Sequence, residues 1–523
     1  MKGMLRVLSI HDSHNSSICE INKGNIVYFQ EAERLDKNKK SKNWPVLLEK
    51  YKNQNFDKII FVHASTGNSN HIQEFIKNKL LLKNIKYSQI IFSLHHHFFH
   101  ACSAFFNSGL KNSFALVIDG NGATELFKNS SEIISLYYFN KNKYKKIFQV
   151  FQSKHNYVDN KNIFLNTLSL GNMYSTIKKL LNFKEEGSVM GLSSYVTRPI
   201  KQTNINLFTK NKYNHFSSDQ GLIYELNFGY NKYIKENPEF ICKIVQTELE
   251  KIVLNYVSNI INNKKRNLCV SGGVFQNTVL NSKILDICPN LYVDPFADDS
   301  GLSMGAALWH SNKNKFNNKK INNLYLGDSP DYNNLPKNKG TKTTSKKVAE
   351  FISKGNIIAI YQGRNELGKR ALGNRSFLFD PRDYYARDKI NLLKRREWFR
   401  PTAGTVLHEH ADKWFNLKSK KETPFMSYVF DVKKTNIPGV THIDNTCRIQ
   451  TLKKQENFHY YNLINEFYKI TNVPILLNTS FNLAGQPLVN SVEDAIKTLT
   501  NCNNKFNIIY FPEIEKIYEI TDF

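Results

Sequence analysis

The chain has 523 residues, of which 41% are hydrophobic, 13% aromatic and 22% charged, a globular composition that excludes a disordered or fibrous protein. Its length exceeds what one hydrophobic core supports, so two or more domains are expected, and no apolar run reaches the roughly 18 residues that a membrane span needs. Seventy-two Lys and Arg against 45 Asp and Glu give a net charge of +27, which leaves binding of a polyanion open.

A strand followed by a polar loop and a hairpin is predicted twice in the N-terminal half, from apolar runs separated by Gly, Asn and Asp. The segments are 5–10, 11–17, 18–21 and 26–29 in the first copy, and 114–118, 119–122 and 133–139 in the second. This repeat resembles the plan of the actin, sugar-kinase and Hsp70 superfold, whose two loops hold a nucleotide's phosphates. The sequence therefore predicts a duplicated nucleotide-binding core.

Between these copies, a helix is predicted to open at Ser93, its candidate N-cap. His96 and His100 are four residues apart on this helix, so their imidazoles project from one face at a spacing that suits two metal ligands. Histidine pairs also occur as surface or satisfied core residues. Asp119 and Asp299 lie at strand or helix edges and could add carboxylates. Two histidines with carboxylates and open positions suit ferrous iron or another octahedral metal better than structural zinc.

A third strand-to-loop segment carries adjacent glycines. The strand 267–270 leads into 271–273 (Ser-Gly-Gly) and a helix over 274–285. Glycines let the backbone approach a ligand, and a helix N-terminus offers free amides to an anion, although an ordinary strand-to-helix turn has the same pattern. A second glycine-bearing helix start, 298–307, places small residues where a helix packs closely on a sheet.

A domain boundary is predicted where the chain becomes rich in Asn, Lys, Pro, Gly and Ser, over 312–347. It separates an N-terminal domain, 1–335, from a C-terminal domain, 345–523. Strands at 357–361 and 473–477 lead into polar loops. The C-terminal domain is therefore predicted to be α/β, with its loops carrying the chemistry.

The arginines concentrate in the C-terminal domain: nine of the thirteen fall between Arg364 and Arg448. The rest of the positive charge is mostly lysine interleaved with asparagine, which a solvated surface encoded by AT-rich DNA would also produce. Guanidinium groups bind phosphate and carboxylate with two parallel hydrogen bonds. We therefore expect an anion site in the C-terminal third.

Cysteine usage indicates a reducing compartment. The seven cysteines are widely spread and form no C-x-x-C pair, so neither a disulfide framework nor a zinc knuckle is expected. The first apolar stretch is broken by His11, Asp12 and His14, which is not typical of a secretion signal. A cytoplasmic location is expected.

Nine motifs, spread over nearly the whole chain and in the same order, closely resemble the NodU/CmcH family of O-carbamoyltransferases. They are 96–101, 187–192, 271–277, 299–301, 363–375, 380–382, 396–401, 442–451 and 478–482. The resemblance implies an α/β protein with an actin-like (ASKHA) N-terminal domain and a smaller YrdC-like C-terminal domain. In the family, carbamoyl phosphate and ATP form carbamoyladenylate in the second domain, and the carbamoyl group passes to an acceptor hydroxyl in the first.

The resemblance also implies roles for individual residues of the N-terminal domain. His14 would be the catalytic histidine, which takes the proton of the acceptor hydroxyl. Fe(II) or another divalent metal would polarise the carbamoyl carbonyl. Its ligands would be His96, His100, Asp299 and Asp119. The adenylate would be bound by Gly187, Gly191, Ser271, Gly272, Gly273 and Asn277.

In the C-terminal domain, the resemblance implies that Lys394 and Arg448 bind carbamoyl phosphate, with ATP bound alongside and Mg²⁺ accompanying it. The residues expected around these phosphates are Arg364, Arg370, Arg375, Arg396, Asn478 and Ser480. Family members commonly have Pro at the position of Lys369 and Glu at that of Gln486, and some carry Arg near Ala484. Lys369 or Arg396 could replace that missing cation.

Two acceptors are compatible with this chemistry. One is a hydroxyl of a small metabolite or sugar, and the other is a polymer such as 5-hydroxymethylated bases in DNA, which would suit a protein of charge +27. A hypothesis of another class is a non-catalytic polyanion-binding protein on an enzyme scaffold. A sugar kinase would leave the arginine-rich domain unexplained. The family resemblance makes a homodimer an expectation, and no membrane partner is expected.

Overall fold

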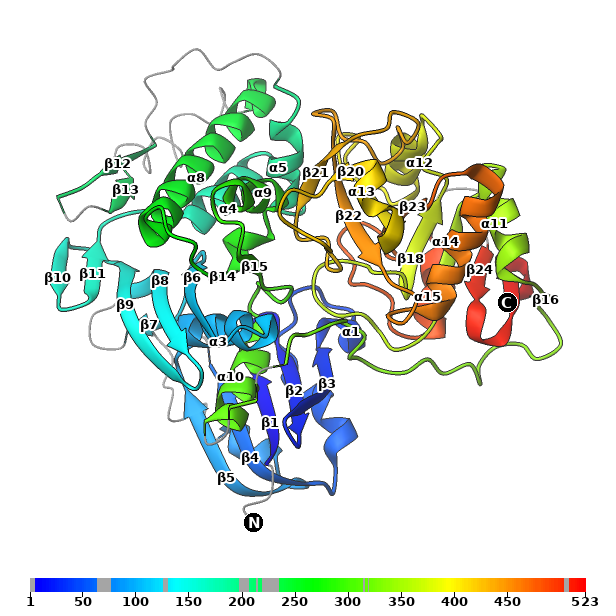
Figure 1. Cartoon of the computed structure of the whole chain (residues 1–523). Coiled ribbons are helices and arrows are strands. Elements are labelled where there is room, and N and C mark those ends of the chain that lie inside the picture. The colour runs from blue at the N-terminus through cyan, green and yellow to red at the C-terminus, as the bar shows by residue number, and fades with distance from the viewer. Residues whose placement is uncertain are drawn as a thin grey trace. The chain divides into compact units, whose positions relative to one another are not determined.

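The computed structural model describes residues 5–63, 77–125, 130–196, 207–212, 215–218, 235–313, 316–317, 319–502 and 508–523 (Figure 1). The chain divides into two units, one formed by 1–36 with 40–321 and the other by 37–39 with 322–523. The expected limits of 1–335 and 345–523 stay predictions. Among the described helices, none combines the length and the apolar character that crossing a bilayer requires.

The first unit contains a five-stranded sheet in the order β3-β2-β1-β4-β5. Its strands are β1 (Arg6–His11), β2 (Ser17–Asn22), β3 (Asn25–Glu31), β4 (Asn55–Val62) and β5 (Lys86–Ser93). The strands β1, β2 and β3 form an antiparallel meander, whereas β4 pairs in parallel with β1 and β5 pairs in parallel with β4. Every residue of β1 after Arg6 is buried, as expected for a central strand covered on both faces.

A second sheet repeats this plan, with β9-β8-β6-β14-β15 in the positions of β3-β2-β1-β4-β5. The strands β6, β8 and β9 are antiparallel neighbours, and β14 and β15 follow β6 in parallel. The bounds are β6 (Asn112–Ile118), β8 (Ser130–Asn140), β9 (Lys143–Gln152), β14 (Leu268–Ser271) and β15 (Leu291–Val293), with β7 (Thr124–Glu125), β10 (Tyr157–Asp159) and β11 (Asn162–Leu165) as additions. The predicted duplication is therefore confirmed, and the unit has an actin-like α/β plan.

Two helices form a layer between these sheets. Helix α10 (Gly301–Asn312) packs on β1, β2 and β4, helix α3 (His96–Ser108) packs on β6, β8 and β14, and the two helices pack on each other (Figure 1). At their crossing, a Cβ on Gly305 would lie 1.9 Å from the carbonyl oxygen of Phe99. Glycine therefore allows the two backbones to touch.

The predicted start of α3 is wrong. Ser93 ends β5, and the N-cap is His95, whose side chain makes no capping hydrogen bond. The apolar run of β5 continues to Ser93, so the strand takes the residue that a helix would use as its cap. At its other end α3 terminates on Gly109 with a φ of 74°, the left-handed conformation that glycine adopts without strain.

Of the remaining helices of the first unit, η1 contacts β2 and α1 contacts β3, and the others group around α8. Helix α8 contacts α4, α5 and α9. The predicted helix after the Ser-Gly-Gly segment is divided into a 3₁₀ turn and α9, because Asn277 caps a new helix. The bounds are α1 (Glu33–Asp36), η1 (Trp44–Tyr51), α4 (Leu170–Leu180), α5 (Gly187–Ser193), β12 (Phe208–Lys210), β13 (Phe216–Ser218), α8 (Pro238–Ile261), η3 (Gly273–Gln276) and α9 (Thr278–Ile287).

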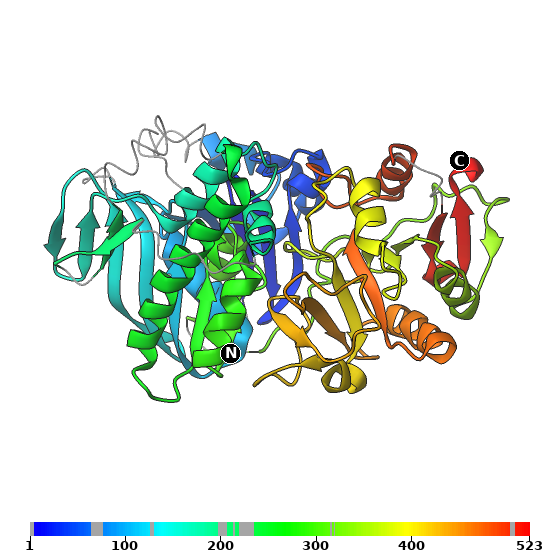
Figure 2. The ribbon, with the colours of Figure 1, turned by 90° about the horizontal axis from the view of Figure 1, so that it is seen from above.

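The second unit is built on one mixed sheet, whose strands are coloured from yellow-green to red in Figure 2. The strand order is β16-β25-β24-β17-β18-β23-β19-β22-β21-β20. The predicted α/β class of this unit is confirmed. The strands predicted near 357–361 and 473–477 are present as β17 and β23. The strands are β16 (Thr341–Lys342), β17 (Ile358–Tyr361), β18 (Arg375–Phe379), β19 (Ala403–Leu407), β20 (Phe415–Asn416), β21 (Val429–Val432), β22 (Thr446–Leu452), β23 (Ile475–Ser480), β24 (Ile508–Phe511) and β25 (Lys516–Glu519). The helices are α11 (Ser345–Ser353), α12 (Ala386–Leu393), α13 (Ala411–Trp414), α14 (Phe458–Thr471) and α15 (Val492–Thr500).

Candidate active site

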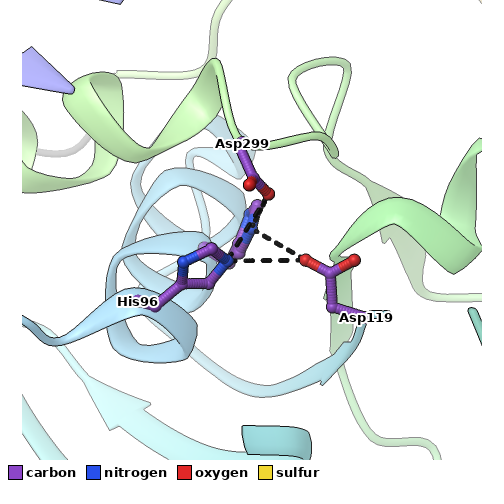
Figure 3. A group of neighbouring side chains, drawn as sticks. His96, Asp119 and Asp299 are labelled. Carbon is purple, nitrogen blue, oxygen red and sulfur yellow. Dashed lines mark ion pairs between the residues drawn. The ribbon is translucent and has the colours of Figure 1, made fainter. Parts of the chain in front are cut away.

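Four predicted metal ligands converge where β6, α3 and α10 meet. The potential ligand atoms of His96, His100, Asp119 and Asp299 lie within 4.8 Å of one another, and Figure 3 shows the labelled side chains pointing toward one centre. The Nε2 atom of His96 is 3.5 Å from Oδ2 of Asp119 and 3.4 Å from Oδ1 of Asp299. The Nε2 atom of His100 is 3.5 Å from each of the same two oxygens. We call these four residues the metal cluster.

The spacing of the metal cluster fits a shared cation better than direct hydrogen bonds. Hydrogen bonds from ring nitrogen to carboxylate are about 2.7 to 3.2 Å long, and neither histidine Nε2 has a hydrogen-bond partner within the described part of the chain. Two ligands held about 2.1 Å from one ion at a tetrahedral angle lie about 3.4 Å apart. The donor set therefore fits one divalent metal.

Electrostatics in the metal cluster also favour a cation. Burial lowers the pKa of His96, but Asp299 and Asp119 outweigh it and raise that pKa to about 10. Burial raises the pKa of Asp299, but His96, His100 and His14 outweigh it and hold that pKa well below its usual range. Burial also raises the pKa of Asp119, but the neighbouring imidazoles outweigh it and lower that pKa. Two carboxylates with low pKa values therefore face the ring nitrogens, and a divalent metal would compensate their negative charge.

His14 extends from the loop between β1 and β2 to the edge of the metal cluster. Its Nε2 atom is 2.9 Å from Oδ2 of Asp299, and its side chain is 48% exposed, whereas those of His96 and His100 are fully buried. The hydrogen bond to Asp299 raises the pKa of His14. His14 is therefore the histidine of this group that a substrate can reach from solvent.

The Ser-Gly-Gly segment holds Asp119. Gly272 has a φ of 96°, and a Cβ on it would lie 2.3 Å from the carbonyl oxygen of Ile118. The amide of Gly273 donates to Oδ1 of Asp119 at 3.2 Å. That bond leaves Oδ2 to face the histidines, so this segment orients a ligand of the metal cluster.

Four arginines gather in the second unit. Burial, and then the positive charges of Arg370, Arg396 and Arg400, lower the pKa of Arg448 well below the usual value. Within the described residues, the buried Nε of Arg448 has no hydrogen-bond partner. Glu397 lies 3.6 Å from Arg400. We call these four arginines the arginine cluster; an anion bound beside them would lower their mutual repulsion.

Lys394 and Ser480, both predicted at the anion site, lie in contact. The ammonium of Lys394 donates to the Oγ of Ser480 and to Oδ1 of Asn482, each at 2.9 Å. Asn478 is buried on the same strand as Ser480, and its Nδ2 donates to Oγ1 of Thr405 at 3.0 Å. The structure therefore brings the end of α12 to the end of β23.

Comparison with known proteins identifies the family. Residues 52–308 match the family described as Carbamoyltransferase N-terminus, and residues 349–513 match the one described as Carbamoyltransferase C-terminus. An uncharacterized protein of Methanocaldococcus jannaschii is 32% identical over 538 residues, which cover 94% of this chain and 96% of that protein. The chain belongs to the carbamoyltransferase family. The predicted family and the prediction of a carbamoyltransferase enzyme are confirmed.

Other relatives of this carbamoyltransferase carry nodulation names. Nodulation protein NolNO of Sinorhizobium fredii is 34% identical over 459 residues, covering 77% of this chain and 61% of that protein. Nodulation protein NolO of Bradyrhizobium diazoefficiens is 39% identical over 253 residues, covering 44% and 46%. Among solved structures, full-length HypF in its phosphate- and nucleotide-bound form has a TM-score of 0.39 and 14% identity, and the match covers 60% of this chain and 56% of that one.

Two arginines predicted at the ATP phosphates of this carbamoyltransferase donate hydrogen bonds to backbone carbonyls of the protein. Arg375 is fully buried, stacks 3.6 Å from the centre of the Tyr361 ring, and donates to the carbonyls of Gln362, Gly363 and Asn374. Arg364 donates through Nε to the carbonyl of Gly327 at 2.9 Å. A role at the phosphates stays a prediction for both.

The residues predicted to bind the adenylate also have structural contacts. Asn277 caps α9 by accepting from the amide of Leu280, and it donates to Gln246 at 2.8 Å. Gly187 begins α5 and Gly191 lies within it. Their role at the adenylate stays a prediction.

Proposed function

We propose that this carbamoyltransferase forms carbamoyladenylate from ATP and carbamoyl phosphate and transfers the carbamoyl group to a hydroxyl of a small metabolite or sugar. In the first step water is consumed, and phosphate and pyrophosphate leave. In the second step the acceptor oxygen bonds to the carbamoyl carbon, the bond to AMP breaks, and the hydroxyl proton passes to a base. The observation that carries the proposal is His14 paired with Asp299 at the metal cluster, in a chain of this family.

The first step suits the residues of the second unit. The arginine cluster and Lys394 provide positive charge for the phosphates of both substrates. Guanidinium groups held close together before substrate binds are attractive to an anion, because binding relieves their mutual repulsion. ATP would bring Mg²⁺ to these phosphates.

The second step suits the metal cluster and His14. The Nε2 of His14 hydrogen-bonds to Oδ2 of Asp299, which leaves Nδ1 to accept the proton of the acceptor hydroxyl. Asp299 then stabilises the imidazolium, as the carboxylate does in a Ser-His-Asp triad. A divalent metal such as Fe(II) at the metal cluster would supply Lewis-acid polarisation of the carbamoyl carbonyl.

The test measures pyrophosphate and AMP released from ATP in the presence of Fe(II). We expect pyrophosphate only when carbamoyl phosphate is added, and we expect AMP release to accelerate when a pool of small hydroxylated metabolites is included. Duplex DNA containing 5-hydroxymethylcytosine forms a separate arm, because the charge of +27 suits a polyanionic acceptor. Acceleration by DNA alone would move the acceptor to the polymer class, and absence of carbamoyl-phosphate-dependent pyrophosphate would favour the non-catalytic scaffold.

A further inference from the structure

Asp294 is a buried carboxylate that lies beyond the metal cluster and takes no part in the proposed chemistry. It directly follows β15, it is 2% exposed, and its Oδ1 accepts from the amide of Phe296 at 3.2 Å. Its Oδ2 accepts from the hydroxyl of Ser271 at 3.0 Å. A buried carboxylate held by an amide and a hydroxyl is restricted to one orientation.

Ser271 connects this carboxylate to His100. Ser271 is fully buried, and its Oγ lies 3.3 Å from Nδ1 of His100. An ionised carboxylate only accepts hydrogen bonds, and Oδ2 of Asp294 accepts from the hydroxyl of Ser271. Because the hydroxyl of Ser271 has a single proton and donates it to Asp294, its lone pair faces Nδ1 of His100. Nδ1 must then carry the proton.

The direction of these two bonds determines the state of the other ring nitrogen. A neutral imidazole with its proton on Nδ1 has a lone pair on Nε2. In His100 this is the nitrogen that faces Asp119 and Asp299 at 3.5 Å. The bonds therefore prepare Nε2 to bind a metal. In the described structure, Nδ1 of His96 has no such partner.

We propose that Ser271 and Asp294 are positioning residues that hold His100 in the Nδ1–H form, with Nε2 directed at the metal. The proposal rests on the proposed metal-dependent function. It also gives Ser271 a role different from the predicted contact with the adenylate. Outer partners of metal-bound histidines typically change metal affinity by about 10- to 100-fold when they are removed.

The test measures Co(II) affinity by competition with a chelator, together with the visible Co(II) absorption of the saturated protein. Ser271→Ala and Asp294→Asn should each weaken binding about 10- to 100-fold and change the spectrum, because the ring of His100 is no longer held. The double variant should lose no more than the more affected single variant, since both residues act through one chain of hydrogen bonds. If Ser271→Ala does not fold, Asp294→Asn carries the same test.

Ser113→Ala is the matched control. Ser113 is a buried serine on the neighbouring strand β6, and its hydroxyl donates to the carbonyl of Phe114 at 2.7 Å. This variant should keep the affinity and spectrum of the wild type. Wild-type affinity and spectrum in Ser271→Ala and Asp294→Asn would overturn the positioning role alone, whereas a wild-type protein that binds no Co(II) would overturn the metal centre itself.

Discussion

At the scale of single residues, the carboxylates of the metal cluster divide their two oxygens between two tasks. Asp299 faces the histidines of the metal cluster through Oδ1 and accepts from His14 through Oδ2. Asp119 faces them through Oδ2 and accepts from Gly273 through Oδ1. One oxygen of each carboxylate is thus fixed by the protein, so the other is oriented before a metal arrives.

Asp294 should make stability depend on pH in a predictable direction. The pKa of Asp294 is about 6 in the folded protein, against 3.8 for an aspartate that burial does not perturb. Between these two pH values the folded state therefore binds more protons than the unfolded state. Stability should therefore fall as pH rises from 4 to 6, by up to ~3 kcal/mol. Asp294→Asn should remove this fall, as measured by urea unfolding across that pH range. Equal pH profiles for the two proteins would contradict this account.

Arg375 is expected to stabilise the folded protein. Arg375→Met should lower the free energy of unfolding by about 2 to 4 kcal/mol, because buried carbonyls lose their donor. Arg387→Ala is the control, since Arg387 is partly exposed and pairs with Asp388. Urea unfolding measures both variants. A Met variant that keeps wild-type stability but binds ATP poorly would instead support the predicted role at the phosphates.

At the scale of elements, the site depends on where helices and strands begin and end. The ligands of the metal cluster come from the first turns of α3, the end of β6 and the residue two before α10. The crossing of α3 and α10 at Gly305 therefore sets the distance between the histidines and Asp299.

Gly305→Ala tests this crossing. The added Cβ would lie 1.9 Å from the carbonyl oxygen of Phe99, so the helices must separate. We expect a loss of at least about 2 kcal/mol in stability and weaker Co(II) binding. Ser311→Ala, at a partly exposed position of the same helix, should change neither quantity. Wild-type Co(II) affinity in Gly305→Ala would show that the crossing does not control the metal cluster.

Local sequence patterns predicted many of the strands and the histidine pair. The contacts that these patterns did not predict were missed for physical reasons. Apolar runs and turn residues located the duplicated strands, and the i, i+4 spacing located His96 and His100, because these signals are local. The bonds that join Ser271 to His100 link residues 171 apart, and no local pattern contains such a pairing. The hydrogen bond from Arg375 to the carbonyl of Gly363 spans 12 residues, and the motif alone does not show this contact.

At the scale of the whole molecule, each unit holds one set of chemical groups. The metal cluster and His14 belong to the first unit, and the arginine cluster and Lys394 belong to the second. The proposed reaction has two steps with different needs: binding of several phosphates, and activation of a carbonyl beside a base. We therefore expect the two steps to be separable by mutation.

The most direct test of this account is carbamoyl-phosphate-dependent exchange of radiolabelled pyrophosphate into ATP, measured beside carbamoyl transfer to the acceptor. His14→Ala should keep the exchange and lose the transfer, because His14 acts only on the acceptor hydroxyl. Arg448→Met should lose both, because no carbamoyladenylate forms. Loss of exchange in His14→Ala, or its persistence in Arg448→Met, would contradict the assignment of the two steps to these two sets of residues.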